Sequence, residues 1–461
     1  MIRKLVVANR GEIARRVFRT CRELGIATVA VHSDADATAP FVAEADQAIR
    51  LPGDAPADTY LRGDLIIEAA RAAGADAIHP GYGFLSENAA FARAVEAAGL
   101  TWIGPAPESI ESMGSKIEAK RIMAAAGVPI LGVDLAAVTA ADLPVLVKAS
   151  AGGGGRGMRI VGSLDRLAEQ VAQAEAEAAS AFGDGTVFAE PYLPTARHVE
   201  VQVLADTHGT VWVLGDRDCS IQRRHQKVVE EAPAPFLAAG TRTVLHDSAR
   251  AAAHAVGYRG AGTVEFLVDA DRVFFLEMNT RLQVEHPVTE CVTGLDLVAL
   301  QIAVAEGKAL PGEPPAISGH AIEVRLYAED PAGGFTPQTG RIRTFDFPSS
   351  VRVDSAVEAG STVGVHYDAM LAKVVAYAAD RDAAIRRLGD ALRRGRVHGV
   401  VTNLDLLRAV ISDDEFTAGR IHTTLLDQRL DQWTGGADPR SLAKAALAAA
   451  IGQASQTAAA A

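Results

Sequence analysis

Two acidic residues stand at mirrored positions around a predicted turn, and this pattern constrains the fold more than any other feature of the sequence. Residues 262–277 read GTVEFLVDADRVFFLE, two apolar runs that flank an Asp-rich turn. Glu265 and Glu277 each lie six positions from Asp271. A hairpin that turns at Asp271 would set both carboxylates opposite each other on one face. Because like charges so close repel, we expect a cation between them, and oxygen ligands of this kind suit Mg²⁺ or Mn²⁺.

Beyond the hairpin, polar side chains continue at every second position. The five residues with this spacing are Glu277, Asn279, Arg281, Gln283 and Glu285. In an extended segment all five would project to one side. A solvated strand face is the commoner explanation of such alternation. The opposite face is not a strong apolar stripe, however, and the acids, amides and guanidinium gather on one side, so we interpret the segment as a functional site.

A glycine-rich segment follows an apolar strand predicted at 143–147. Residues 148–157 read KASAGGGGRG, which matches neither the Rossmann nor the Walker spacing. Glycines allow successive backbone N–H groups to converge on phosphate oxygens. A flexible linker is the alternative. We favour a phosphate-binding loop because Lys148 and Arg156 stand where the charge of a triphosphate needs compensation.

Several basic residues indicate a binding site only when they are considered together. The alternating runs at 198–202 (HVEVQ) and 225–227 (HQK) are each, taken alone, more typical of an exposed strand or a solvated basic turn. Lys116 falls in the first turn of a helix that Ser115 is predicted to cap, where the helix dipole disfavours a cation unless an anion is near. Together these features describe the site of a nucleotide-dependent ligase or phosphoryl-transfer enzyme.

The composition excludes some classes of protein. The 461 residues correspond to about three domains. The net charge of −12 argues against a protein that coats nucleic acid or an anionic membrane. Three widely spaced cysteines fit no disulfide framework, and no apolar run approaches the ~20 residues of a membrane-spanning helix. We therefore expect a soluble, cytoplasmic protein without nucleic-acid or membrane partners.

The pattern of apolar residues divides the chain into α/β and α+β parts. A strand at 4–8, a helix at 12–24 and a strand at 26–31 form a β-α-β unit, which predicts a doubly wound sheet. The expected segments are a doubly wound domain at 1–112, a mixed domain at 113–330, a β-rich domain at 331–432 and an Ala-rich tail or linker at 433–461.

Five motifs together resemble the biotin carboxylase family, the ATP-grasp component of biotin-dependent acyl-CoA carboxylases. They are NRGEIA at 9–14, HPGYGFLSEN at 79–88, the glycine loop, RRHQK at 223–227 and EMNTRLQVEH at 277–286. The resemblance runs from about residue 2 to residue 430. It implies that 113–330 is an ATP-grasp domain with a mobile glycine-rich lid at about 130–200. It also implies ATP-dependent carboxylation of biotin by bicarbonate through carboxyphosphate, with Mg²⁺ or Mn²⁺.

The resemblance assigns a role to each matched residue. ATP phosphates or ribose would be held by Lys116, Lys148, His198 and His225, with Gly154 and Gly155 closing over them. The adenine hinge would be Glu190, Pro191, Tyr192 and Leu193. The divalent ions would be ligated by Glu265, Glu277 and Asn279. Bicarbonate would be held by Lys227, Arg281, Gln283 and Val284. Glu285 would be the general base, and Arg352 would stabilise the biotin enolate.

Two positions depart from the family pattern, and neither should abolish activity. Ala151 replaces a glycine that many relatives have, but four consecutive glycines remain. Pro191 replaces a common hinge lysine, yet it keeps the backbone carbonyl that adenine recognition needs, and the N–H would come from Leu193.

The sequence contains no AMKM biotinylation motif. The biotin carboxyl carrier and the carboxyltransferase are therefore expected to be separate subunits or parts of a longer chain, and the family commonly forms homodimers or larger carboxylase complexes. Two alternatives remain. One is another ATP-grasp ligase of the carbamoyl-phosphate or purine-pathway type, and the other is a catalytically silent nucleotide-binding subunit.

Overall fold

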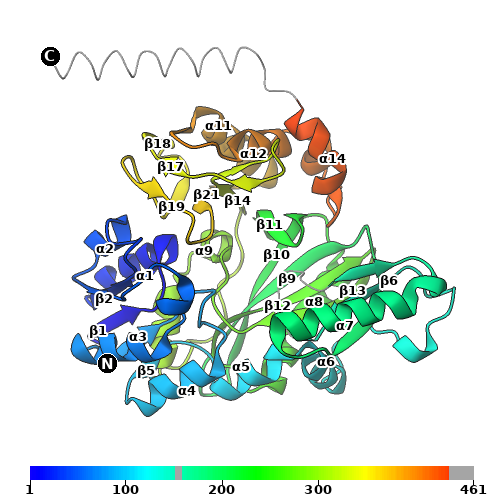
Figure 1. Ribbon diagram of the computed structural model, residues 1–461, viewed down its shortest axis with the longest axis horizontal. Coiled ribbons are helices and arrows are strands. Elements are labelled where there is room, and N and C mark those ends of the chain that lie inside the picture. The colour runs from blue at the N-terminus through cyan, green and yellow to red at the C-terminus, as the bar shows by residue number, and fades with distance from the viewer. Residues whose placement is uncertain (151–157, 436–461) are drawn as a thin grey trace.

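One large antiparallel sheet runs through the centre of the molecule (Figure 1). The computed structural model describes residues 1–150 and 158–435. The eight strands lie in the order β13-β12-β9-β10-β11-β14-β21-β19. Their bounds are β9 Arg197–Ala205, β10 Val211–Arg223, β11 Gln226–Ala232, β12 Gly260–Asp269, β13 Arg272–Asn279, β14 His320–Tyr327, β19 Arg352–Ser355 and β21 Met370–Ala378.

The N-terminal domain is the predicted doubly wound sheet. Its five parallel strands lie in the order β3-β2-β1-β4-β5, with bounds Gln47–Arg50, Ala27–His32, Lys4–Val7, Ala77–His79 and Thr101–Trp102. The helices are α1 Gly11–Glu23, α2 Pro40–Glu44, α3 Gly63–Ala72, α4 Ala89–Ala97 and α5 Pro107–Gly114. Leu5 packs in one core with Val17, whereas Val6 packs in another with Ile66. Alternate residues of β1 are thus buried on both faces, as a doubly wound sheet requires.

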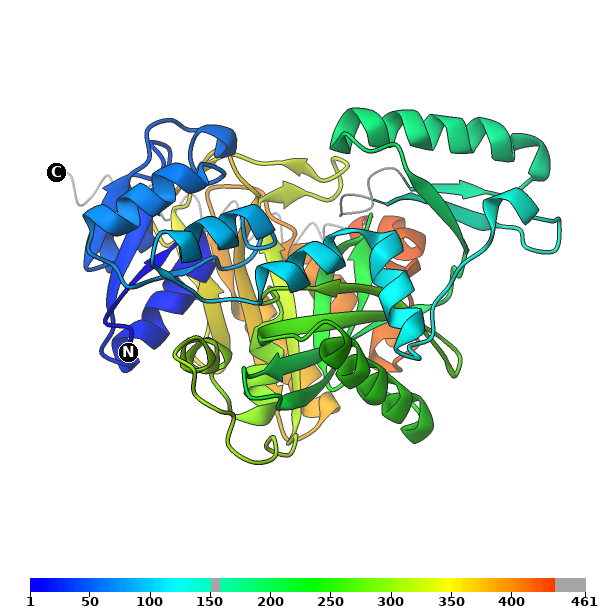
Figure 2. The ribbon, with the colours of Figure 1, turned by 90° about the horizontal axis from the view of Figure 1, so that it is seen from below.

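The predicted lid is a small separate layer. Helix α6 (Lys116–Ala125) leads into the sheet β7-β6-β8, whose bounds are Arg159–Val161, Val145–Ala149 and Val187–Pro191, and α7 (Leu167–Phe182) packs on it. Figure 2 shows α7 and these strands projecting from the rest of the molecule. Val145, Val147, Val161 and Ala174 form its own small core. Gly154 and Gly155 lie outside the described residues.

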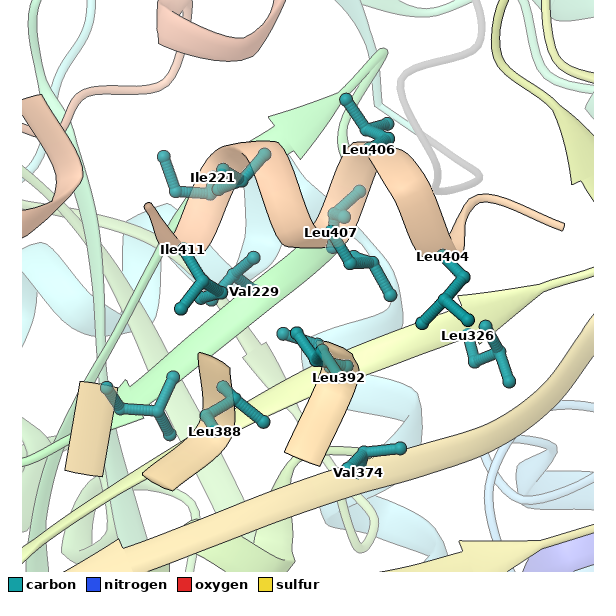
Figure 3. Packing of buried hydrophobic residues seen from close by; sticks show 14 of the residues in the cluster. Ile221, Val229, Leu326, Val374, Leu388, Leu392, Leu404, Leu406, Leu407 and Ile411 are labelled. Atoms are coloured by element: carbon teal, nitrogen blue, oxygen red, sulfur yellow. The ribbon is translucent and has the colours of Figure 1, made fainter. Parts of the chain in front are cut away.

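The C-terminal part shares its sheet and its core with the ATP-grasp part. Helix α11 (Arg381–Arg394) packs on strands β14 and β21, and α12 (Leu404–Ile411) packs on α11 and β14. Figure 3 shows Leu388, Leu392 and Leu407 from these helices against Val229 of β11. Further elements are α13 Asp414–Thr417, α14 Leu425–Thr434 and the short strands β15 Glu329–Asp330, β16 Thr336–Pro337, β17 Gly340–Arg341, β18 Thr344–Asp346, β20 Thr362–Val363 and β22 Arg396–His398.

The structure corrects the expectation for the polar run and adds elements that were not predicted. The polar run at 277–285 was predicted to be extended throughout, but β13 ends at Asn279, and Glu285 is the N-cap of α9 (His286–Thr293). Helix α8 (Ala239–Ala255) was not predicted. Its buried face is built largely from alanines, which separate poorly from the alanines on its exposed face. Helix α10 spans Leu297–Ala305, and 3₁₀ turns lie at Pro56–Asp58, Leu135–Ala137 and Leu164–Arg166.

Within the described residues, no single helix is long and apolar enough to cross a membrane. Helices α9 and α10 reach the necessary length and composition only when taken together, across a bend of 95°.

His79, at the end of β4, should contribute a pH-dependent part of the stability. Its ring is fully buried, accepts the Gly81 N–H at 2.9 Å and lies 3.3 Å from the Gln301 amide oxygen. Burial lowers the pKa of His79 to about 4, against about 6.5 in an unfolded chain. The unfolded state therefore binds the proton first. The stabilisation is complete above about pH 6.5 and is lost as the pH falls towards about 4.

We expect the wild type to lose about 2 kcal/mol more unfolding free energy than His79→Asn between pH 7 and pH 5, measured by urea unfolding. Asparagine retains an acceptor near the Gly81 N–H but does not titrate. The exposed His398 provides a matched control, and His398→Asn should keep the wild-type pH dependence. Equal pH slopes for wild type and His79→Asn would disprove the assignment.

Candidate active site

The ammonium of Lys227 lies at the centre of a buried cluster of carboxylates. Its Nζ is 2.6 Å from Glu200 Oε2, 2.8 Å from Glu265 Oε1 and 2.6 Å from Glu285 Oε1. The three glutamates come from β9, β12 and the start of α9, so one cation joins three separate elements. Burial would lower the pKa of Lys227, but the three carboxylates outweigh it and raise the pKa well above its ordinary value. Lys227 is therefore charged.

Two arginines complete the charge balance on the outer side of the cluster. Arg217 Nε is 2.5 Å from Glu200 Oε1, and its Nη1 donates to both Gln202 Oε1 and Thr289 Oγ1. Arg325 Nη2 is 2.9 Å from Glu285 Oε2. Burial would raise the pKa of Glu285, but the charges of Lys227, Arg325 and Arg217 lower it well below its ordinary range. Glu285 is thus an ionised carboxylate inside the protein.

The polar groups of the 277–285 run converge although the strand ends halfway along it. Arg281 donates to Asn279 Oδ1 at 2.8 Å and to Gln283 Oε1 at 2.9 Å. Gln283 in turn donates to Glu265 Oε1 at 3.1 Å. Arg281 is also paired with Glu87 of the N-terminal domain at 2.8 Å. Chain reversal into α9, rather than strict alternation, brings the last of these side chains to the cluster.

The predicted pair of facing carboxylates is confirmed. Glu265 and Glu277 are direct cross-strand partners in the β12-β13 hairpin. Burial and the charge of Glu265 raise the pKa of Glu277. Asn279, whose oxygen faces Arg281, continues the same strand edge. This set of hard oxygen donors, in which one carboxylate raises the pKa of the next, fits a divalent cation such as Mg²⁺ or Mn²⁺.

His198 joins the cluster from β9. Its Nε2 lies 2.9 Å from Glu265 Oε2. Burial would lower the pKa of His198, but Glu265 raises it. His225 instead lies in the β10-β11 turn, where Arg224 and His225 both have positive φ. Burial, then the charges of Lys148 and His198, lower the pKa of His225.

A second group of charges lies at the border between α6 and the lid. Lys148 of β6 and Lys120 of α6 both pair with Glu190 of β8, and all three side chains are buried. The Lys116 N–H donates to the Ser150 carbonyl at 3.2 Å, which places the start of α6 beside the last described residue before the glycine loop. Burial lowers the pKa of Lys116, with Glu277 acting in the opposite direction.

The expected adenine hinge lies where the lid rejoins the main sheet. Strand β8 ends at Pro191, and the Tyr192 N–H donates to the Pro144 carbonyl at 2.9 Å. Leu193 follows in the connection to β9.

Val284, a predicted bicarbonate ligand, lies in the 277–285 run beside Glu285. Its carbonyl accepts a hydrogen bond from Lys373 at 2.7 Å.

Arg352 is not brought into this cluster. Its guanidinium lies on β19, 2.8 Å from Glu290 and 2.7 Å from Asp354. Within the described part of the chain, Arg352 forms ion pairs with these two acids, and neither acid contacts Lys227 or Glu285. Arg325, two strands away on β14, is the guanidinium that contacts Glu285.

Five residues of the site were missed by the sequence reasoning: Glu87, Lys120, Glu200, Arg217 and Arg325. Some signal was available for three of them. Glu200 lies between His198 and Gln202 in the alternating run, Lys120 follows Lys116 by one helical turn, and Arg325 interrupts an apolar strand. Glu87 lies in the 79–88 motif but was given no role there, and nothing in the local pattern marked Arg217, whose partners come from distant segments.

Three family models match successive parts of the chain, and two of them describe biotin carboxylase domains. Family models match at residues 1–110 (biotin carboxylase, N-terminal domain), 109–313 (carbamoyl-phosphate synthase L chain, ATP binding domain) and 323–428 (biotin carboxylase C-terminal domain). The biotin carboxylase of Halalkalibacterium halodurans is 48% identical over 451 residues, covering 94% of this chain and 99% of the relative. The methylcrotonoyl-CoA carboxylase subunit alpha of Glycine max is 49% identical over 92% of this chain, which spans 60% of that subunit.

Solved structures give the same result. The biotin carboxylase–β,γ-ATP complex from Campylobacter jejuni has a TM-score of 0.89 and 43% identity, over 93% of this chain and 99% of the other. The biotin carboxylase domain of 2-oxoglutarate carboxylase from Hydrogenobacter thermophilus, described in complex with MgADP, ADP and bicarbonate, also has a TM-score of 0.89 and 43% identity, over 94% and 99%. The chain therefore belongs to the biotin carboxylase family of ATP-dependent ligases.

Proposed function

We propose that this chain catalyses the ATP-dependent carboxylation of biotin by bicarbonate, with the biotin carried on a partner protein or domain. One observation carries the proposal. Glu285 is a buried, ionised carboxylate held between Lys227 and Arg325, and the same lysine contacts Glu265 of the facing acidic pair. A base and a cation site that share one lysine suit a reaction between a small oxyanion and a metal-bound triphosphate.

Glu285 supplies the base. Bicarbonate is a poor nucleophile, so a positioned carboxylate must remove its proton as it attacks the γ-phosphate. Lys227, Arg281 and Gln283, with the backbone of Val284, are the proposed bicarbonate ligands. Lys227 now divides its charge among three carboxylates. When it turns to bicarbonate, its hold on Glu285 weakens, and the pKa of Glu285 rises towards the range that a base requires.

The nucleotide occupies the region between the acidic pair and the lid. Lys116, Lys148, His198 and His225 are proposed to bind phosphates or ribose, and the segment 190–193 to bind adenine. Glu265, Glu277 and Asn279 would hold Mg²⁺ or Mn²⁺. The bound ion would spread the charge of the transferring phosphoryl group. Gly154 and Gly155 are proposed to cover the phosphates and exclude water, which would otherwise hydrolyse carboxyphosphate.

Arg325 takes the role that the sequence suggested for Arg352. Carboxyphosphate breaks down to CO₂ and phosphate, and phosphate takes the ureido proton of biotin. The biotin enolate then carries a negative oxygen, which suits a permanently charged guanidinium. Arg325 pairs with Glu230 and lies 2.9 Å from the proposed base, whereas both acidic partners of Arg352, Glu290 and Asp354, lie outside the cluster.

The relatives include subunits and domains of larger carboxylases. We propose that a biotin carboxyl carrier and a carboxyltransferase act with this chain, and that the carboxyltransferase selects the acceptor. Phosphate release from ATP should then depend on bicarbonate, Mg²⁺ and biotin together, in an assay that omits each in turn. ATP turnover indifferent to biotin would instead indicate another ATP-grasp ligase. Nucleotide binding without turnover would indicate a silent subunit.

Glu285→Gln should lower the rate of biotin carboxylation at least about 100-fold while ATP still binds, because the amide cannot accept the bicarbonate proton. Carboxybiotin formation and nucleotide binding are the two measurements. Glu231→Gln is a matched control, since Glu231 is also a buried, ion-paired glutamate of the central sheet but contacts His320 and Arg381. Wild-type rates in Glu285→Gln would remove Glu285 from the role of base.

Arg325→Met should reduce biotin carboxylation about 100-fold, because the enolate oxygen loses its counter-charge. Arg352→Met should reduce it less than about tenfold, because that guanidinium is bound elsewhere. Initial rates of carboxybiotin formation at saturating ATP and bicarbonate compare the two variants. The reverse order of effects would return the role to Arg352.

A further inference from the structure

Lys120 binds both segments that connect the lid to the body of the molecule. The chain enters the lid near Leu131 and leaves it along β8. Lys120 Nζ donates to the Leu131 carbonyl at 2.7 Å and pairs with Glu190 of β8. The same nitrogen lies 4.5 Å from the centre of the Phe188 ring. One ammonium on α6 therefore contacts the entry and the exit of the lid.

The charges around Glu190 do not balance. Lys120, Lys148 and Glu190 are 8%, 5% and 2% exposed, so two ammonium groups share one carboxylate away from bulk water. Burial, partly offset by Glu190, lowers the pKa of Lys120, and Lys148 lowers it further. An uncompensated buried charge is costly unless a further counter-ion joins it. The group therefore carries an excess positive charge that an anion would neutralise.

Lys148 is the member of this group that can meet such an anion. It lies on β6, two residues before the last described residue ahead of the glycine loop, and its Nζ contacts Glu190 Oε2. If Lys148 were the sole partner of Glu190, its movement towards a phosphate would leave the buried Glu190 carboxylate without a counter-ion, which is energetically costly. Lys120 contacts the other oxygen of Glu190 and removes that obstacle.

We propose that Lys120 is a positioning residue for nucleotide binding. It fixes Glu190 at the hinge of the lid and neutralises it, so that Lys148 is available to the phosphates. The inference rests on the proposed function only in requiring that this pocket binds a nucleoside triphosphate.

Lys120→Met removes the charge and keeps an apolar stem beside Phe188. We expect the dissociation constant for Mg-ATP to rise roughly tenfold, because Glu190 then holds Lys148 alone. Adenosine, which has no phosphate, should change less than about twofold. Both are measured by displacement of a fluorescent ATP analogue from the full chain. Arg121→Met is the matched control, since Arg121 is the next residue of α6 but is exposed and paired with Glu118. It should bind Mg-ATP as the wild type does.

A second substitution separates charge compensation from simple support of the hinge. Adding Glu190→Gln to Lys120→Met should restore Mg-ATP affinity to within about threefold of wild type, because no carboxylate then competes for Lys148. Equal losses for ATP and adenosine, or weaker ATP binding in the double variant than in Lys120→Met, would overturn the proposal.

The test does not depend on the folding of one variant or on the proposed carboxylation activity. If Lys120→Met does not fold, Lys120→Gln, which also lacks the charge, should bind Mg-ATP about tenfold more weakly than wild type with adenosine binding changed less than about twofold, and wild-type Mg-ATP affinity in this variant would overturn the inference. Because the readout is nucleotide binding, it holds whether or not the chain carboxylates biotin. Failure of biotin-dependent phosphate release would count against the proposed function alone.

Discussion

The contact of one lysine with three glutamates is the constraint on which the site depends. Glu200, Glu265 and Glu285 come from three separate elements, and without Lys227 their charges would repel inside the protein. Arg217 and Arg325 offset part of the remaining negative charge from the far side. The site thus holds the proposed catalytic groups in place by pairing them with one another. In the proposed function, substrates would bind by replacing these partners.

The central sheet also buries acidic side chains outside this cluster. The cross-strand neighbours Glu230 and Glu323 are both fully buried, and burial raises the pKa of each of them. Glu230 pairs with Arg325 at 2.5 Å, and Glu200, whose pKa burial also raises, contacts both Arg217 and Lys227. Contact with a cation therefore does not by itself set the pKa of an acid in this sheet, because burial and the neighbouring carboxylates act against it.

Local sequence patterns predicted the parts of the site that depend on short-range geometry. The facing pair Glu265 and Glu277 followed from the hairpin register alone. The convergence of the 277–285 run was also predicted, although its cause is a strand that ends at Asn279 and a helix that begins beyond Glu285. Arg325 could not be chosen over Arg352 from the sequence, because both are lone arginines in strands and only the strand order separates them. The three-domain fold was predictable because five separate motifs, spread from residue 9 to residue 286, all resemble the same family.

The pairing of β14 has a consequence for how such a protein can be divided. Strand β14 forms ladders with β11 on one side and β21 on the other, and Val229 of the ATP-grasp part packs in the same core as Leu388 of the C-terminal part. A cut near residue 315 would leave a long apolar strand edge open on each fragment, which is a template for aggregation. The stretch from β9 to β21 should therefore be kept whole when the chain is shortened or divided into fragments for expression.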